Sequence, residues 1–144
     1  MTRLVVVLAS WWLAGAAPAA PPIGQRILHH EAMKAVAGET AGRALSFEAY
    51  GRRFDFRLER NDRMRFVDGA RMPGVEALRG TVDGAPGSWV RLTRTPAGLI
   101  GLFSDGQDLY VIEPADTAAR HAVGPPAAKG SAPVVYRLAD TVMP

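Results

Sequence analysis

The 144-residue sequence contains no cysteine. Disulfide bonds, thiolate metal ligands and the cysteine of a lipoprotein signal are therefore excluded. The sequence has three histidines, and His30-Glu31 is followed by Ala32, Met33 and Lys34. The zinc-binding helix motif needs a second histidine four residues after the first, so this stretch lacks a ligand. Two surface histidines on a strand edge explain the pattern better than a metal site.

Other catalytic patterns are also missing. The sequence has no Gly-x-Ser-x-Gly motif, and Ser88, Ser104 and Ser131 fall in turns or in a linker. Asp105 and Asp108 are better explained as turn residues than as a pair of catalytic carboxylates. The glycine-rich stretches are not followed by a helix, which a phosphate loop requires. We therefore expect no catalytic residue, no metal site and no cofactor, and we predict that the chain is not an enzyme.

A continuous basic stripe is absent although the net charge is +3. The arginines between Arg52 and Arg71 are interleaved with acidic residues, namely Asp55, Glu59, Asp62 and Asp68. This alternation is typical of a solvated sheet face and argues against a nucleic-acid partner.

The first 19 residues have the pattern of a Sec-type signal peptide. Arg3 precedes an uncharged apolar run over 4–15, and Ala17-Pro18-Ala19 offers small residues for cleavage. The run is shorter than the ~20 residues that span a bilayer, so we expect no stable membrane insertion after the signal is removed. Cleavage after Ala19 is favoured over Ala20, because the second choice places Pro21 directly after the cut. The chain is thus predicted to be secreted or periplasmic.

Residues 45–59 predict a β-hairpin, because apolar and polar side chains alternate on both sides of Gly51-Arg52. A two-residue type II′ turn at Gly51-Arg52 would set three apolar pairs on one face: Ala49 with Phe54, Phe47 with Phe56, and Leu45 with Leu58. It would also set Glu48 opposite Asp55, a small penalty. The preceding residues 25–36 are ambiguous, and we expect a short strand through His30 followed by a short helix.

Residues 78–115 predict an antiparallel meander of four strands, with bounds 78–82, 88–94, 99–104 and 108–113. A type I′ turn at Asp105-Gly106 would pair Leu102 with Leu109, Ile100 with Val111, Gly101 with Tyr110 and Leu99 with Ile112. Both faces of this hairpin are then largely apolar. We expect it to be covered on both sides, or to lie centrally in a sandwich.

The fold class that follows is mainly β, an antiparallel meander or β-sandwich of about six to eight short strands, with at most one short helix near the N-terminus. The predicted organisation is a signal peptide (1–19), a β domain (20–123), a Pro/Gly/Ala linker (124–133) and a terminal strand with a tail (134–144). A further short strand is expected over 64–67. The linker GPPAAKGSAP is too poor in apolar side chains to pack well.

Two stretches, FEAYGRRF (47–54) and GAPGSW (84–89), carry a resemblance to a known family. With their surroundings, over about 25–138, they resemble the N-terminal propeptide of reprolysin (adamalysin)-type zinc metallopeptidases, most of all the bacterial secreted members. The resemblance implies an intramolecular chaperone and latency module whose partner, in cis or in trans, is a metzincin catalytic domain. The catalytic HExxHxxGxxH segment is absent from this chain, and zinc blockade by a cysteine cannot operate.

The resemblance also implies steric occlusion of the protease cleft, by the sheet and by the segment 124–144. The alternative is a stand-alone exported β-sandwich that binds a protein or a glycan at the cell surface. Candidate contacts for either partner are Trp89, Arg91, Tyr110 and Tyr136, although aromatic residues in sheets more often lie in the core.

Overall fold

A computed structural model of the chain describes residues 26–35, 44–63, 72–124 and 132–142. Within these ranges the protein is mainly β, with a sheet of nine antiparallel strands and a small sheet of two. The predicted class, mainly β and antiparallel, is confirmed, although the number of strands exceeds the expected six to eight. The signal peptide with Ala19 and Ala20, and the strand expected over 64–67, lie outside the described residues.

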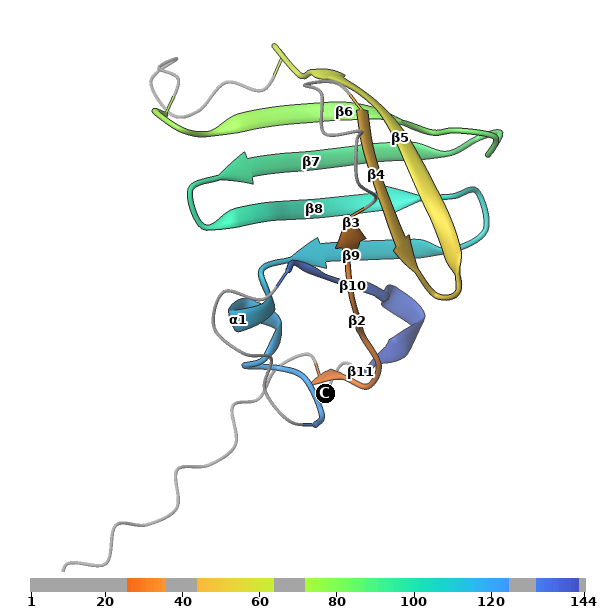
Figure 1. Ribbon diagram of the computed structural model, residues 1–144, viewed down its shortest axis with the longest axis vertical. Helices are drawn as coiled ribbons and strands as arrows, with labels where there is room; N and C mark the ends of the chain where they lie inside the picture. Colours follow the sequence, from red (N-terminus) through yellow and green to blue (C-terminus); the bar gives the residue numbers. More distant parts are fainter. Residues whose placement is uncertain (1–25, 36–43, 64–71, 125–131, 143–144) are drawn as a thin grey trace, which may run out of the picture.

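Four strands form the predicted meander in the middle of the large sheet (Figure 1). They are β6 (Glu76–Val82), β7 (Trp89–Thr95), β8 (Gly98–Ser104) and β9 (Leu109–Glu113). Each begins and ends within two residues of its predicted bounds. The turn residues between the apolar runs were therefore sufficient to locate these strands.

The hairpin of β4 (Ala44–Ala49) and β5 (Arg52–Arg60) forms a second layer. It crosses in front of the meander (Figure 1), although β5 is paired with β6 in the same sheet. One sheet thus turns over on itself and supplies both layers. This arrangement buries the face of the meander that looks toward β4 and β5.

The segment 31–35 joins the two ends of the sheet order. Its first part, β2 (Glu31–Ala32), pairs with β10 (Val134–Arg137), and its second part, β3 (Lys34–Ala35), pairs with β4. Within the described residues, each strand from β4 to β10 therefore has a strand partner on both sides. The helix expected after His30 is wrong here, because pairing with two strands overrides the weak helical spacing.

The remaining elements lie beside β9 and β10. The small sheet pairs β1 (Arg26–Ile27) with β11 (Thr141–Val142), and η2 (Leu138–Asp140) is a single 3-10 turn. The α-helix among the described residues is α1 (Ala115–Ala118), far in sequence from the expected N-terminal position. The predicted terminal strand exists as β10 and belongs to the main sheet.

The β4–β5 register differs from the prediction by two residues. The turn is Tyr50-Gly51, both with positive φ (54° and 68°), and Phe47 lies opposite Phe54. A shift of two keeps the apolar side chains on the predicted face. It also places Glu48 opposite Arg53 instead of Asp55, which removes the like-charge pair that the predicted register required.

The β8–β9 register is also shifted by two residues, because the loop spans Asp105 to Asp108. Phe103 lies opposite Tyr110, and Gly101 lies opposite Ile112. The Asp105 carboxylate accepts hydrogen bonds from the backbone N–H groups of Gln107 (2.9 Å) and Asp108 (2.8 Å). These bonds stabilise a four-residue loop over the predicted two-residue turn.

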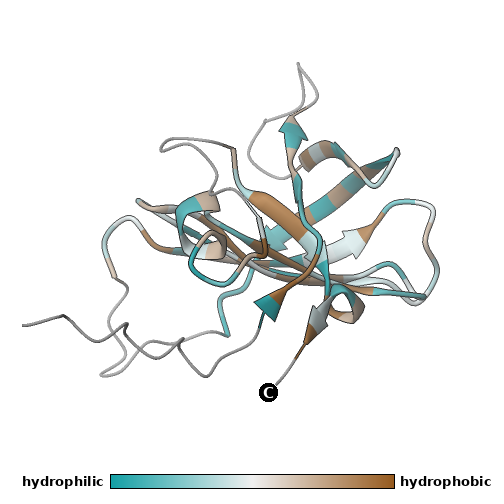
Figure 2. Ribbon diagram, turned by 90° about the horizontal axis from the view of Figure 1, so that it is seen from below, coloured by the Kyte–Doolittle hydropathy of each residue, from teal (hydrophilic) through white to brown (hydrophobic). Residues whose placement is uncertain are grey.

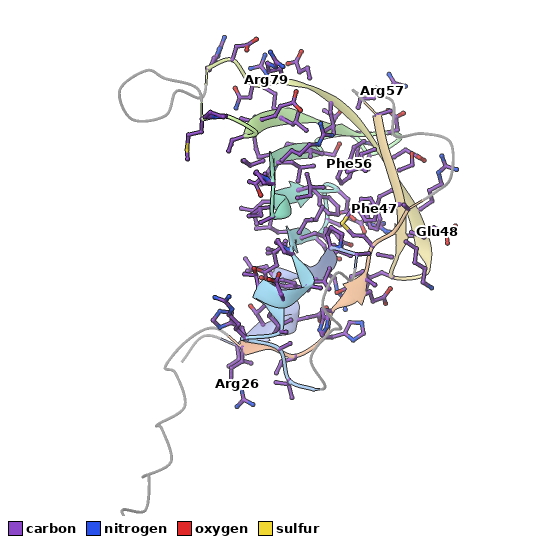
Figure 3. The ribbon with its side chains drawn as sticks, turned by 60° about the vertical axis from the view of Figure 1, so that its left-hand side comes forward. Arg26, Phe47, Glu48, Phe56, Arg57 and Arg79 are labelled. Carbon is purple, nitrogen blue, oxygen red and sulfur yellow. The ribbon has the colours of Figure 1, made fainter. Side chains whose placement is uncertain are left out.

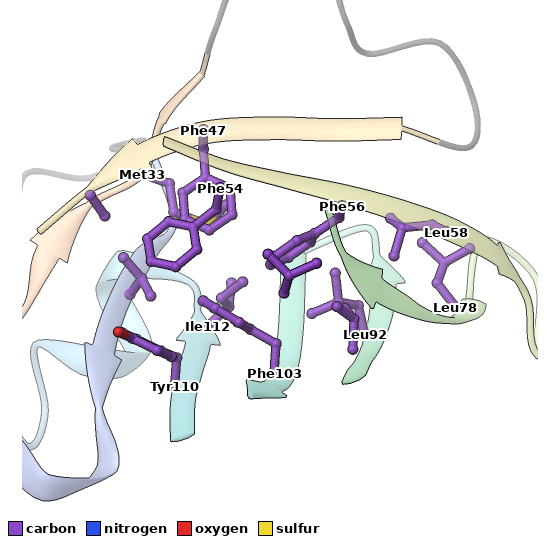
Figure 4. Close-up of a cluster of buried hydrophobic side chains, with 14 residues drawn as sticks. Met33, Phe47, Phe54, Phe56, Leu58, Leu78, Leu92, Phe103, Tyr110 and Ile112 are labelled. Carbon is purple, nitrogen blue, oxygen red and sulfur yellow. The ribbon is translucent and has the colours of Figure 1, made fainter. Parts of the chain in front are cut away.

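An aromatic cluster fills the space between the hairpin and the meander (Figure 4). The Phe103 and Tyr110 rings stack with centroids 4.6 Å apart, and Phe54 meets both rings edge-on. Offset and edge-on pairs of this kind add to the stabilisation from burial alone. The cluster consists of Met33, Phe47, Ala49, Phe54, Phe56, Leu58, Leu78, Val82, Val90, Leu92, Phe103, Tyr110, Ile112 and Val135.

A second, smaller cluster lies on the opposite face of β9 and β10. It consists of Ile27, Ala115, Ala118, Val134 and Tyr136, with Val111 packed against it. The expectation of cover on both faces therefore holds for β9 but is wrong for β8, where Ile100 and Leu102 remain 42% and 40% exposed. The structure leaves this part of the meander open on one side.

A substitution at Gly101 would test how closely β8 approaches β7. A Cβ atom there would lie 2.1 Å from the Arg91 carbonyl oxygen, a contact with backbone that cannot move aside easily. We expect Gly101→Ala to lower the free energy of unfolding by ~3 kcal/mol. The control is Gly84→Ala, where φ is positive but the added atom meets nothing within 4 Å, so only ~1 kcal/mol should be lost. Equal losses in urea unfolding would contradict this packing.

Candidate functional site: the outer face of the meander

The outer face of β7 and β8 is the most exposed apolar part of the sheet. Val90, Leu92 and Phe103 point into the aromatic cluster, so the alternating residues between them point the other way. The side chains so exposed, which we call the outer face, are Trp89, Arg91, Ile100 and Leu102. Seen edge-on, the meander is a thin layer with the β4–β5 hairpin on one side (Figure 2).

Arg91 is a cation without a carboxylate partner among the described residues. Its guanidinium donates to the neighbouring Val90 carbonyl oxygen at 2.7 Å. The other arginines of β6 and β7 behave differently, since Arg79 pairs with Glu59 (2.6 Å) and Arg94 with Glu76 (2.7 Å). In the sheet register Arg91 lies directly opposite Leu102. The outer face thus combines apolar side chains with one uncompensated positive charge.

The four predicted contact residues lie in different places. Trp89 (36% exposed) and Arg91 lie together on the outer face, whereas Tyr110 and Tyr136 are only 3% and 5% exposed. Tyr110 belongs to the aromatic cluster and Tyr136 to the second cluster. Neither tyrosine ring contributes to the outer surface of this chain.

Sequence reasoning missed Ile100 and Leu102 as surface residues. Their neighbours Leu99, Gly101 and Phe103 are not polar, so the sequence predicts both residues to be covered. Which face of a two-sided apolar strand receives a cover depends on elements distant in sequence. No local signal in β8 distinguishes the two faces.

A polar cluster at one end of the sheet ties β5 to the β8–β9 loop. Arg52 donates to the Asp105 carboxylate and to the Tyr110 hydroxyl (3.0 Å), and its guanidinium lies 4.4 Å from the Phe54 ring centroid. Burial of the Asp105 side chain, which is 6% exposed, raises its pKa, but the amide bonds of Asp108 and Gln107 and the charge of Arg52 outweigh burial. The net result is a pKa of about 2.

A second polar cluster surrounds Tyr50 in the β4–β5 turn. Its backbone N–H donates to Glu31 Oε2 (2.7 Å), and its hydroxyl donates to Asp140 Oδ2 (3.2 Å). Arg137 lies 5.0 Å from the ring centroid. Burial raises the pKa of the Tyr50 hydroxyl to about 12. Glu31 therefore holds a turn in place, and among the described residues no group of three acidic or histidine side chains is arranged to hold a metal.

The two stretches that carry the family resemblance meet in space. A hollow of about 420 Å³ is lined by 52–54 from the first stretch, by 82–86 around the second, and by Asp105, Gly106 and Gln107. Trp89 ends the second stretch and begins β7. The resemblance residues thus gather at one end of the sheet, and one of them belongs to the outer face.

Comparisons with known proteins supply no relative: no protein-family model, no curated protein and no solved structure matches this chain. Over the described residues, none of the helices has the length and apolar character required to cross a membrane.

Asp105 should control the acid stability of the fold. Because its folded pKa of about 2 lies below the ordinary value of 3.8, its stabilisation is complete above pH ~4 and is lost as the pH falls toward 2. We expect Asp105→Asn to lower the free energy of unfolding at pH 7 by ~2 kcal/mol and to flatten its decline between pH 4 and 2. Asp108→Asn, in the same loop, is the matched control for urea unfolding across this range. If the free energy of unfolding of the Asp105→Asn variant declined between pH 4 and 2 as steeply as that of the wild type, Asp105 would not be the group that controls acid stability.

Proposed function

We propose that the chain is an exported, non-catalytic domain of propeptide type that binds a reprolysin-like zinc metallopeptidase domain through its outer face. It would assist folding of that domain and hold it latent. The observation that carries the proposal is the uncovered outer face itself, where Trp89, Ile100 and Leu102 remain exposed on one regular pair of strands.

A surface of this kind is suited to protein binding. Scattered apolar residues are normal on a monomer, but adjacent ones on a flat face often mark an interaction site. Tryptophan and arginine are enriched among the residues that dominate interface energies. Trp89 and Arg91 belong to a paired central strand, so little conformational entropy is lost when they meet a partner.

The other exposed large apolar residues have a different setting. Leu28, Val123, Leu138 and Val142 lie on or beside the short strands β1 and β11, and Met72 precedes β6. They do not belong to the meander. The outer face is favoured over them because long paired strands hold its side chains in fixed positions.

Binding through the face is also favoured over addition of a strand. Within the described residues, β4 to β10 are each paired on both sides. A partner peptide that extended the sheet would need an unpaired edge, and the described strands that keep one, β1, β2, β3 and β11, have only two residues each. The partner is therefore expected to be a folded domain with a complementary surface, which a catalytic domain provides and a single extended peptide does not.

The metallopeptidase is proposed as partner because of the sequence resemblance. Its two most specific stretches converge on the hollow beside Asp105, and one of them ends at Trp89 on the outer face. Occlusion is proposed to be steric, because the chain has no cysteine to bind zinc and no single carboxylate or histidine stands out for that role. The segment 124–144 is not a free arm over its described part, because β10 lies between β9 and β2. We therefore assign the occlusion to the sheet, to which β10 belongs.

The test uses the secreted chain and the metzincin-type metallopeptidases secreted by the same organism. We expect the wild-type chain to inhibit one of them in trans, and the double variant Ile100→Ser/Leu102→Ser to inhibit at least tenfold more weakly. The loss follows from removing two central apolar contacts. Met72→Ser removes an exposed apolar side chain before β6, away from both the outer face and β1, and serves as the control.

The possible outcomes test the identity of the partner and the binding surface separately. If no metallopeptidase is bound or inhibited, the partner assignment fails. A tight complex with a cell-surface protein or glycan would then favour a stand-alone binding domain. If inhibition occurs but the outer-face variant inhibits as well as wild type, the surface assignment fails. Thermal unfolding of each variant verifies that the fold is intact.

A further inference from the structure

A small cavity lies beside the outer face, at the end of β9. It has a volume of about 190 Å³ and is lined by Ile27, Glu113, His121 and Tyr136. We propose that this cavity binds a primary ammonium group, supplied by a lysine side chain of the partner protein. The cavity and its chemistry stand on their own, whereas the source of the ammonium group rests on the proposed function above.

The carboxylate of Glu113 is the group in the cavity that would bind a cation. Its carboxylate is partly buried, accepts a hydrogen bond from the Tyr136 hydroxyl, and has no arginine or lysine in an ion pair with it among the described residues. Burial raises the pKa of Glu113, and neither Tyr136 nor the nearby His121 fully offsets this. A carboxylate withdrawn from water is stabilised when an opposite charge enters the same space.

The shape of the cavity favours an alkylammonium ion over a metal. Ile27 and the ring of Tyr136 supply an apolar part of the wall that suits a methylene chain, while Glu113 and His121 make the rest of the lining polar. The volume corresponds to roughly six water molecules at ~30 Å³ each, which is enough for a short alkylamine. One carboxylate and one phenol provide too few oxygen ligands for calcium, which takes six to eight, and with His121 the described residues still form no group of three His, Asp or Glu side chains that could hold a metal ion. The negative charge of Glu113 excludes anions.

The cavity and the outer face lie on the same side of the sheet. Ile112 points into the aromatic cluster, so Val111 and Glu113 point outward, like Leu102 and Ile100 in the register. With strands ~4.8 Å apart and a rise of ~3.4 Å per residue, the Cα atoms of Arg91 and Glu113 are about 12 Å apart. A matching partner surface presents an acidic group to Arg91 and, about 12 Å away, a lysine to Glu113, with apolar side chains between them.

The test of the cavity uses the isolated chain and n-butylammonium. Binding is followed by the amide and side-chain NMR signals of the cavity residues, with n-butanol and butyrate titrated in parallel. We expect millimolar binding of n-butylammonium and at least tenfold weaker binding of both other compounds. Equal binding of n-butanol by the wild-type chain would overturn the proposal without any variant.

Two substitutions test whether the Glu113 carboxylate is the group that binds n-butylammonium. Glu113→Gln, which keeps the size and the Tyr136 contact, should weaken n-butylammonium binding at least tenfold. Asp116→Asn removes an exposed carboxylate from the nearby helix α1 and should leave binding unchanged. Retained binding in the folded Glu113 variant, or an equal loss in both variants, would overturn the site.

Inhibition of the protease partner tests whether one of its lysine side chains occupies the cavity. When the chain is bound to its protease partner, Glu113→Gln should weaken inhibition at least fivefold and excess n-butylammonium should compete. If outer-face substitutions abolish inhibition while Glu113→Gln leaves it unchanged, the lysine assignment fails and the proposed function stands. If no partner is found but the amine binds, the proposed function fails and the cavity stands.

Discussion

The β4–β5 hairpin packs against the meander, and this contact forms the main core of the protein. Phe54 from the hairpin contacts Phe103 and Tyr110 from the meander, and Phe47 and Phe56 extend the same layer (Figure 4). Because β5 also pairs with β6, the sheet must turn sharply to bring its own faces together. This folding buries one face of the meander and decides which side chains remain outside.

Polar clusters hold the folded sheet closed at its edges. Arg52 and Asp105 join the hairpin to the β8–β9 loop, while Glu31, Asp140 and Arg137 surround Tyr50 at the hairpin turn. Tyr50 adopts a positive φ of 54°, a conformation that costs energy for a bulky residue. The bonds to its N–H and hydroxyl, together with burial of its ring, offset that cost. These contacts therefore stabilise the hairpin turn.

The two faces of the meander are covered unequally. The inner face is filled by aromatic rings, the outer face of β9–β10 is filled by the second cluster, and the outer face of β7–β8 is left open. Among the described residues, the open part carries a cation without a carboxylate partner, Arg91, and borders a cavity whose carboxylate, Glu113, has no arginine or lysine partner. Figure 3 shows the side chains on the ribbon. Both features suit recognition of a shaped and charged partner surface.

The fold class and the four meander strands could be predicted from the sequence, because turn residues and apolar alternation act over a few neighbouring positions. The sequence did not determine the two hairpin registers, each of which is shifted by two residues. The Asp105 carboxylate lengthens one turn through its amide bonds, and Glu31 supports Tyr50 in the other from a distant segment. Charge pairing across the strands could have favoured the correct β4–β5 register, since it places Glu48 opposite Arg53.

The exposure of individual apolar residues could not be predicted, because it depends on packing between distant segments. Trp89 and Arg91 were named from the sequence, but Tyr110 and Tyr136 are buried and Ile100 and Leu102 are exposed. The segment 31–35 became two strands because β10 and β4 offered unpaired edges to it. Glu113, His121, Ile27 and Tyr136 form a cavity only because α1 and β1 pack beside β9 and β10. These outcomes depend on contacts between residues far apart in the chain, which local periodicity does not encode.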